Sequence, residues 1–242
     1  MNQVTCFCRS APMGSTACEI CKHDLACPVH ERACPQPSNS QELVHIKPNI
    51  YDQLDIPESD RLTSIRKDQA EYMYEFVSQI PAYNTLETGF AYGCSAAHII
   101  SAKHKNGFHT VIDPNQESKY NNIGFRNLVK LRLATKIIFR NTYSYLALPD
   151  MVAGGQIIDF AFLDGSHLFE DILLDFYYSA MMLTNGGYIM FDDAWMKSVV
   201  KVAQYIVANR KDFTLIPRTH HNVIVFQKIG SDEREWNHFE PF

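Results

Sequence analysis

The sequence predicts an α/β protein built on a doubly wound, mostly parallel β-sheet. Short apolar runs alternate with amphipathic helical patterns from about residue 64 to 209. The runs at 160–163 and 188–191 are uninterrupted, which is typical of strands covered by helices on both faces. A short polar turn between two late apolar runs predicts an antiparallel hairpin at the end of the sheet.

The expected elements follow one another in regular order. A first helix over 64–80 places Ile65, Phe76 and Ile80 roughly on one face, and Pro81 ends it. Later helices are expected at 95–103, 120–133, 168–183 and 196–209. The parallel strands are expected at 84–88, 110–113, 135–140, 158–164 and 188–192. The hairpin strands are expected at 213–216 and 223–228.

Length and charge limit the classes of protein that fit. The 242 residues suffice for one large domain and a small appendage, which we place at 41–242 and 1–40 because Pro, Ser and Asn cluster near the boundary. A net charge of −5 argues against a general nucleic-acid or membrane-surface binder. The chain has neither a membrane-spanning apolar stretch nor the apolar core of a signal peptide, so we expect a cytoplasmic protein.

The segment 1–40 is rich in cysteine. Six of the seven cysteines lie there, among few large apolar residues. The pairs Cys6/Cys8 and Cys18/Cys21 could supply four thiolate ligands to a zinc ion, and Cys27, His30 and Cys34 could extend or replace that set. The alternative is a flexible tail with free thiols. A disulfide framework is not expected without a secretory signal.

Carboxylates follow two of the buried strands. Asp164 ends the strand over 158–164, and Asp192 and Asp193 end the strand over 188–192. Ligands bind at the carboxyl ends of the strands in open α/β sheets. Because unpaired buried carboxylates are costly, this convergence indicates a divalent cation. The alternative is a set of separate loop carboxylates that cap helices.

The first strand ends in a glycine turn. Gly89 allows a tight turn close to a ligand, and Gly93 allows the turn to approach the following helix. Ala91 takes the middle place of GxGxxG, so the dinucleotide fingerprint is absent, as is a phosphate loop. Asp113, at the end of the next strand, is placed to accept hydrogen bonds from the ribose hydroxyls of a nucleoside. With Glu87 before the turn, these residues indicate a nucleoside ligand without a pyrophosphate.

The chain resembles the class I S-adenosylmethionine-dependent methyltransferases over about residues 45–242, and more narrowly the O-methyltransferase-like family called methyltransferase type 24. The resemblance rests on segments 86–95, 111–116, 162–167, 186–193 and 235–242. It implies a seven-stranded Rossmann-like methyltransferase sheet whose last strand is antiparallel. It also implies the residues that bind S-adenosylmethionine: Glu87, Gly89, Gly93 and Ser95 at the methionine end, Asp113 at the ribose, and Asn141 and Thr142 near the adenine. The cysteine-rich segment is not part of the family pattern.

The residues also suggest how a hydroxyl could be methylated. A magnesium ion on Asp164, Asp192 and Asp193 could lower the pKa of an acceptor hydroxyl. By resemblance to catechol-type enzymes, the place three residues after the first metal carboxylate holds a base, and here that residue is His167. The alternative for His167 is a helix-starting residue that bonds its neighbours. We interpret His220 and His221 as a hairpin turn rather than the rim of the site.

The sequence therefore predicts an S-adenosylmethionine-dependent methyltransferase that O-methylates a small hydroxylated molecule, such as a sugar or a phenol, with His167 and Asp164 as catalytic residues. Trp195 and Tyr143 are candidates for the wall of the substrate pocket, with ordinary packing as the alternative. A catalytically silent fold acting as a zinc-dependent interaction protein is the competing hypothesis. A nucleotide-dependent oxidoreductase is disfavoured by the missing fingerprint. Neither the acceptor nor a homo-oligomeric state follows from the sequence.

Overall fold

The computed structural model of the chain describes residues 49–62, 64–217 and 220–242. Three predictions lie outside these residues: the segment 1–40, its boundary with the main domain, and the zinc ligands Cys6, Cys8, Cys18 and Cys21. The described residues all belong to one compact unit, which begins at Pro48.

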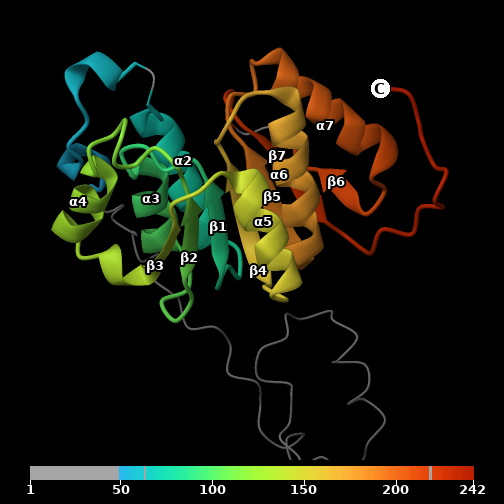
Figure 1. Ribbon diagram of the computed structural model, residues 1–242, viewed down its shortest axis with the longest axis horizontal. Coiled ribbons are helices and arrows are strands. Elements are labelled where there is room, and N and C mark those ends of the chain that lie inside the picture. The colour runs from blue at the N-terminus through green and yellow to red at the C-terminus, as the bar shows by residue number, and fades with distance from the viewer. Residues whose placement is uncertain (1–48, 63, 218–219) are drawn as a thin grey trace, which may run out of the picture. The chain divides into compact units, whose positions relative to one another are not determined.

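Within the described residues, seven strands form one sheet in the order β3-β2-β1-β4-β5-β7-β6 (Figure 1). The strands are β1 Thr85–Thr88, β2 His109–Ile112, β3 Ile137–Arg140, β4 Ile158–Leu163, β5 Leu183–Phe191, β6 Phe213–Leu215 and β7 Ile224–Lys228. Strands β1 to β5 pair in parallel, and β7 runs antiparallel between β5 and β6. The doubly wound, mostly parallel sheet and the late hairpin are thus confirmed.

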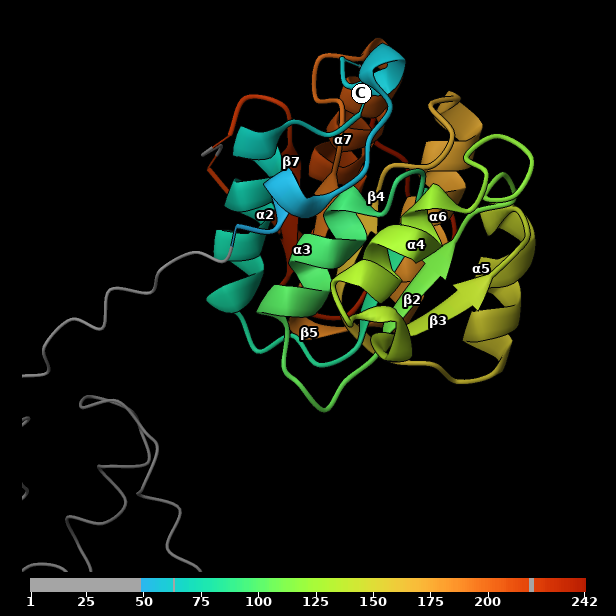
Figure 2. The same ribbon diagram turned by 90° about the vertical axis from the view of Figure 1, so that its left-hand side faces the viewer.

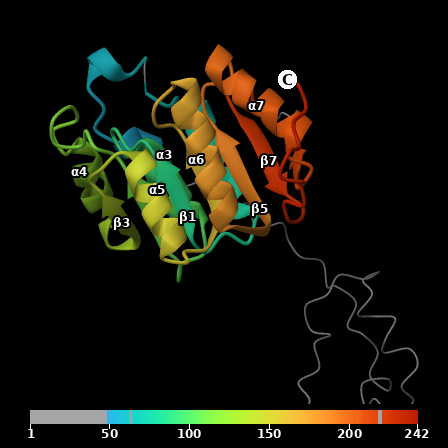
Figure 3. The same cartoon turned by 45° about the vertical axis from the view of Figure 1, so that its right-hand side comes forward.

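Helices cover both faces of the sheet. One layer contains α2 Lys67–Ser78, α3 Cys94–Ala102 and α4 Ile123–Lys130 (Figure 2). The other contains α5 Ser144–Ala153, α6 Phe169–Met182 and α7 Lys197–Asn209 (Figure 3). Three 3₁₀ turns, η3 Tyr51–Gln53, η4 Glu58–Asp60 and η5 Ala134–Lys136, complete the described elements. None of the described helices is long and apolar enough to cross a membrane.

The central strand β4 shows how the sheet joins the two layers. Ala161 and Leu163 lie in the apolar cluster that includes residues of α5, α6 and α7. Phe160 and Phe162 lie in a second cluster with residues of α2 and α3. Because successive side chains of a strand point to opposite faces, an uninterrupted apolar run is what a strand buried on both faces requires. The side chains of the phenylalanines are fully buried, so β4 forms the centre of both cores.

Helix α5 is absent from the elements expected from the sequence. Its buried residues Ala147, Leu148 and Met151 provide only a short apolar pattern, and Pro149 lies inside the helix. Proline removes a backbone N–H and usually marks a helix end, so the local pattern argues against a helix there. Packing against α6 and burial in the apolar cluster stabilise α5 nevertheless.

Strand β5 also differs from the expectation, since it begins at Leu183 rather than at residue 188. Helix α6 ends at Met182, and the chain continues directly into the strand. Gly186 has a φ of +86°, and the register with β4 is irregular between Ile158 and Phe160. A positive φ is unusual inside a strand, and the expected strand begins only after the two glycines.

The sheet order places a crevice between β1 and β4. From β1 the chain winds to β2 and β3 on one side, and it then returns to β4 and β5 on the other. The helices that follow β1 and β4 therefore lie on opposite faces of the sheet, and this switch point is where ligands bind in open α/β sheets.

Candidate active site

The loop after β1 is shaped by glycines. Gly89 has a φ of +86° and Gly93 a φ of +71°, a region that residues with a side chain rarely adopt. A Cβ atom on Gly89 would lie 2.0 Å from the backbone oxygen of Asp164 at the end of β4. Both expected glycines are therefore required by the turn, and Gly89 lets two loops approach closely across the switch point.

Asp113, directly after β2, holds this loop in place. Its Oδ2 accepts hydrogen bonds from the backbone N–H groups of Phe90 and Ala91, each at 3.0 Å, and its Oδ1 accepts one from Asn115 at 2.6 Å. The side chain is buried but lines the cavity. The carboxylate therefore organises the glycine loop, a role that the sequence did not indicate.

Glu87 lies behind the cavity wall rather than on it. Its side chain is fully buried between the hydroxyl of Ser95, which donates to Oε1, and Nε2 of His109, 2.9 Å from Oε2. Nδ1 of His109 lies 2.8 Å from Oγ1 of Thr85. Burial raises the pKa of Glu87. The structure therefore places Glu87 where it positions Ser95, and Ser95 itself lines the cavity.

The predicted carboxylates gather at the carboxyl ends of β4 and β5, and His167 joins them. Nε2 of His167 lies 2.9 Å from Oδ2 of Asp193 and 3.7 Å from Oδ1 of Asp164. One ligand atom from each of these three residues lies within 4.8 Å of the others. Asp192 belongs to the same group, and its carboxylate lies close enough to Asp164 to affect the pKa of that residue.

The pKa values of these residues are shifted because several carboxylates lie close together. Burial and the neighbouring carboxylates raise the pKa of Asp164, and the same causes raise the pKa of Asp192 to about 6. The hydrogen bond to Asp193 raises the pKa of His167, and in turn lowers the pKa of Asp193. Shifts of this kind, with specific charged partners in a cleft, are typical of functional sites.

Two amide side chains that were not among the predicted site residues position Asp192. Its Oδ1 accepts hydrogen bonds from Nε2 of Gln69 in α2 and from Nδ2 of Asn222, the latter at 2.9 Å. The two amides also bond each other at 2.9 Å. In the sequence Gln69 is only part of an amphipathic helix, and Asn222 only part of a turn. No local pattern distinguishes an amide that meets a carboxylate in a distant part of the chain.

A cavity of about 1120 Å³ joins the glycine loop to the carboxylate cluster. The predicted residues that line it are Gly89, Ser95, Asp113, Asp164, His167, Asp192 and Asp193. Trp195 lines it too, with 70% of its surface exposed and its Nε1 donating to Oδ1 of Asp193 at 3.0 Å. The expected aromatic wall therefore includes Trp195 and also Tyr143, whose ring stacks on Tyr145.

Of the predicted site residues that the structure describes, four do not line the cavity. They are Glu87, Gly93, Asn141 and Thr142. After β3, the cavity is lined by Tyr143 and Ser144, the two residues that follow Asn141 and Thr142. Ser144 begins α5, the helix that the local pattern conceals. The path of the chain after β3 therefore does not follow from the local sequence around Asn141 and Thr142.

Comparison with known proteins agrees with this geometry. Residues 86–194 match the family model described as a methyltransferase domain. The match includes the glycine loop, Asp113, His167 and the three clustered carboxylates. This central part of the chain, a little under half of the 242 residues, is therefore similar to a methyltransferase domain. Among curated proteins, no sequence matches.

Solved methyltransferase structures share the fold at low sequence identity. The O-methyltransferase TomG from Streptomyces achromogenes, in complex with SAM, aligns with a TM-score of 0.63 at 15% identity, over 78% of this chain and 93% of that one. The O-methyltransferase from Bacillus cereus, in complex with SAH, aligns with a TM-score of 0.60 at 14% identity, over 69% and 83% of the two chains. The methyltransferase fold, with its Rossmann-like sheet, is therefore established for this chain.

Proposed function

We propose that the protein transfers the methyl group of S-adenosylmethionine to a hydroxyl of a small molecule, assisted by a divalent cation such as Mg²⁺. The observation that carries this proposal is that one cavity contains both the glycine loop held by Asp113 and the group formed by His167, Asp164 and Asp193. A bound nucleoside cofactor and an acceptor hydroxyl would therefore meet in a single space. The two similar O-methyltransferases crystallised with SAM or SAH support the choice of cofactor.

The cofactor half of the cavity fits a ligand that approaches the backbone closely. Gly89 leaves no room for a Cβ because the Asp164 backbone lies against it, so the loop surface is bare backbone at this point. Asp113 and Ser95 supply polar groups, and Tyr143 supplies an aromatic surface for a base. These residues would hold the ribose, the methionine end and the adenine, respectively.

The acceptor half fits a divalent cation in its chemistry. Burial and neighbouring negative charge raise the pKa values of Asp164 and Asp192, as expected for carboxylates whose negative charge is not fully compensated by protein groups. Oxygen ligands suit Mg²⁺. Asp164 and Asp193 are the carboxylates that lie at ligand distance with His167, while Oδ1 of Asp192 is occupied by the two amides. Asp164 and Asp193 would hold the ion, with Asp192 as a neighbouring negative charge.

His167 is the group that would take the acceptor's proton. Its Nε2 faces Asp193 at 2.9 Å, so in the neutral imidazole that nitrogen carries the hydrogen and Nδ1 carries the lone pair. Asp193 then orients the ring and stabilises the imidazolium that forms. The side chain is 35% exposed, which allows the proton to pass to solvent afterwards.

The bound groups would supply the rest of the chemistry: an electrophilic methyl on a sulfonium, and a cation charge that lowers the pKa of the hydroxyl. In the proposed transfer the acceptor oxygen would form a bond to the methyl carbon, the carbon–sulfur bond would break and sulfur would keep the electron pair. The hydroxyl proton goes to His167. The protein's task is mainly to position and desolvate the acceptor, with Trp195 as one wall.

The direct test combines binding and turnover. We expect S-adenosylhomocysteine to bind in titration calorimetry, and a panel of catechols, simple phenols and sugars to yield an acceptor that consumes S-adenosylmethionine. Mg²⁺ should increase the rate and excess EDTA should suppress it. Full activity in EDTA would reject the metal but retain His167 as the base. Absence of S-adenosylhomocysteine binding would reject the enzyme in favour of a silent fold.

The Asp113→Ala substitution should weaken both the cofactor site and the fold. A carboxylate at a strand end is not expected from the sequence to support the core, but in the structure three backbone N–H groups would lose a charged acceptor. Each such hydrogen bond contributes about 1.5–3 kcal/mol. We expect a lower melting temperature without ligand and an affinity for S-adenosylhomocysteine reduced about tenfold or more. Asp150→Ala, which removes only an exposed pair with Arg140, is the control. An unchanged melting temperature would contradict the loop-holding role.

The rate should rise with pH as His167 loses its proton. Because Asp193 raises the pKa of His167, we expect the acidic limb of the kcat profile to have its midpoint above the ordinary value of 6.5. Asp193→Asn removes the charged partner and should move that midpoint to lower pH, even if the rate itself falls. Initial rates of S-adenosylhomocysteine formation across the neutral range measure both profiles. A midpoint that stays in place would mean that another group controls the limb.

A further inference from the structure

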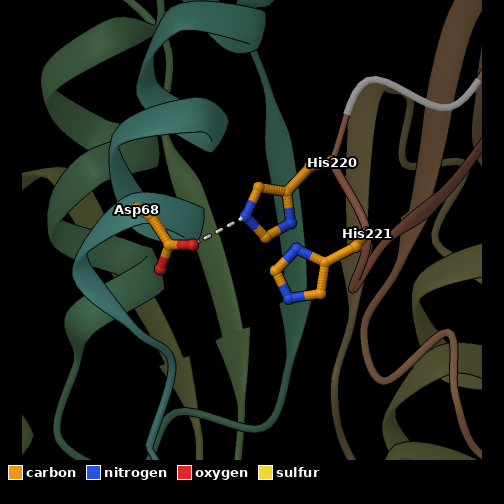
Figure 4. Close-up of side chains that lie close together, drawn as sticks. All are labelled: Asp68, His220 and His221. Atoms are coloured by element: carbon orange, nitrogen blue, oxygen red, sulfur yellow. Dashed lines mark hydrogen bonds and ion pairs between the residues drawn. The ribbon is translucent and has the colours of Figure 1, made fainter.

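A second cluster of potential metal ligands lies at the rim of the cavity, and the proposed function does not use it. Asp68 projects from the first turn of α2, and His220 and His221 project from the segment that leads to β7 (Figure 4). One ligand atom from each lies within 4.8 Å of the others. The two elements are far apart in sequence, so the fold brings these groups together.

His220 is the anchored member of the cluster. Its ring stacks on Tyr72 with centroids 5.5 Å apart, and its side chain is 10% exposed. Its Nε2 lies 3.4 Å from Oδ2 of Asp68. Zinc binds nitrogen and carboxylate oxygen at about 2.0–2.2 Å, so two neighbouring ligand atoms of a tetrahedral site lie about 3.4 Å apart. Asp68 and His220 already have the separation that two such ligands need.

His221 can complete the set because its ring stacks on that of His220, with centroids 4.5 Å apart (Figure 4). It is exposed, and its backbone is fixed by the neighbouring Asn222, which bonds the buried Asp192 at 2.9 Å. One of its ring nitrogens already lies within 4.8 Å of the ligand atoms of Asp68 and His220. Three protein ligands would leave one tetrahedral position for water.

Arg66 now supplies the positive charge at this place. Its Nη2 donates to Nε2 of His221, and its Nε lies 3.4 Å from Oδ1 of Asp68. The Arg66 side chain is 54% exposed and can turn toward solvent without a large desolvation cost. An ion would therefore compete with Arg66 for His221 and Asp68.

The ring of His220 must also change its protonation. Asn222 donates its backbone N–H to Nδ1 of His220 at 3.3 Å, so the ring hydrogen is on Nε2 and must leave that nitrogen before a metal ion binds there.

We propose that Asp68, His220 and His221 form a site for a zinc-class divalent ion that displaces the guanidinium of Arg66. Two imidazoles and one carboxylate are ligands that suit Zn²⁺, whereas Mg²⁺ prefers oxygen ligands alone. The site is therefore chemically distinct from the carboxylates at the ends of β4 and β5. Because Arg66 and His221 line the cavity, the ion would rearrange its outer wall.

The test follows histidine ring nitrogens of the full-length protein by NMR while Zn²⁺ is added. This readout resolves each histidine, so zinc bound by cysteines or by His167 does not obscure the result. Signals are assigned with His220→Gln and His221→Gln. We expect the ring signals of both His220 and His221 to shift with a common saturation curve. If the ring signals of His220 and His221 stay unchanged while zinc saturates other sites, the proposal is wrong.

Variants separate a metal site from incidental contact. Asp68→Asn, which keeps the side chain's size, should weaken the zinc response of His220 by about tenfold or more. Arg66→Gln should strengthen the response severalfold because the competing charge is gone. His104→Gln, an exposed histidine stacked on Tyr83 near the start of β2, is the control and should change neither signal. Equal zinc affinity in Asp68→Asn and the wild type would show that the carboxylate is not a ligand and would reject the site. Turnover is not needed for any of these measurements, so they stand even if the methyltransferase assay finds no acceptor.

Discussion

Gly89→Ala is expected to destabilise the protein by about 3 kcal/mol or more and to abolish cofactor binding. The new Cβ would lie 2.0 Å from the backbone oxygen of Asp164 and 2.8 Å from its carbonyl carbon, so the loops after β1 and β4 must separate. The φ of +86° adds strain for any residue with a side chain. Backbone strain and overpacking each cost about 1–3 kcal/mol. Urea unfolding and calorimetry with S-adenosylhomocysteine measure the two effects.

Gly186 provides a matched control for this substitution. It has the same φ of +86°, but a Cβ there meets nothing within 4 Å. Gly186→Ala should therefore show the backbone strain alone, about 1–2 kcal/mol, with cofactor binding intact. If both alanine variants lost the same stability, the close approach of Gly89 to Asp164 would carry no cost, and the need for glycine would lie only in the turn.

His167→Ala is expected to lower kcat by about 10²–10⁴-fold, the usual contribution of a general base. The affinity for S-adenosylhomocysteine should change little, because His167 bonds the carboxylates at the ends of β4 and β5 and not the loop held by Asp113. Asp192→Asn is expected to lower the rate strongly as well. It should also weaken the response to Mg²⁺, since it removes charge from the cluster.

The control for His167→Ala is His104→Gln, which alters a histidine at the opposite end of the sheet near the start of β2. Its rate should equal that of the wild type. A His167→Ala variant with full activity would leave the cation as the sole source of hydroxyl activation. A rate lost together with cofactor affinity would indicate a collapsed loop instead, and the comparison of the two readouts distinguishes these outcomes.

Much of the architecture could be predicted because it depends on periodic local patterns. The apolar run of β4 indicated a strand buried on both faces, and the structure buries its phenylalanines completely. The pattern was less informative where a conflicting residue interrupts it. Pro149 concealed α5, and the strand expected at 188–192 left out the part of β5 that contains Gly186 and Gly187. In both places, contacts with neighbouring elements outweigh local preference.

Part of the site could be predicted for the same reason. Asp113, Asp164 and Asp193 lie at the ends of strands, and parallel strands bring their carboxyl ends to one edge whatever else the chain does. Such residues were identified by position along the chain. Their detailed roles were not, since Asp113 binds three backbone N–H groups that lie in two different loops.

The sequence by itself determined the order of the seven strands and of the described helices other than α5, the two glycines of the first turn and the carboxylates at the strand ends, because each depends on neighbouring residues. Only the tertiary structure decided which atoms meet. It turned Glu87 toward His109, placed Gln69 and Asn222 on Asp192, and brought Asp68 beside His220. Side-chain contacts between distant segments depend on how helices pack against the sheet, and no periodicity in the chain encodes that packing.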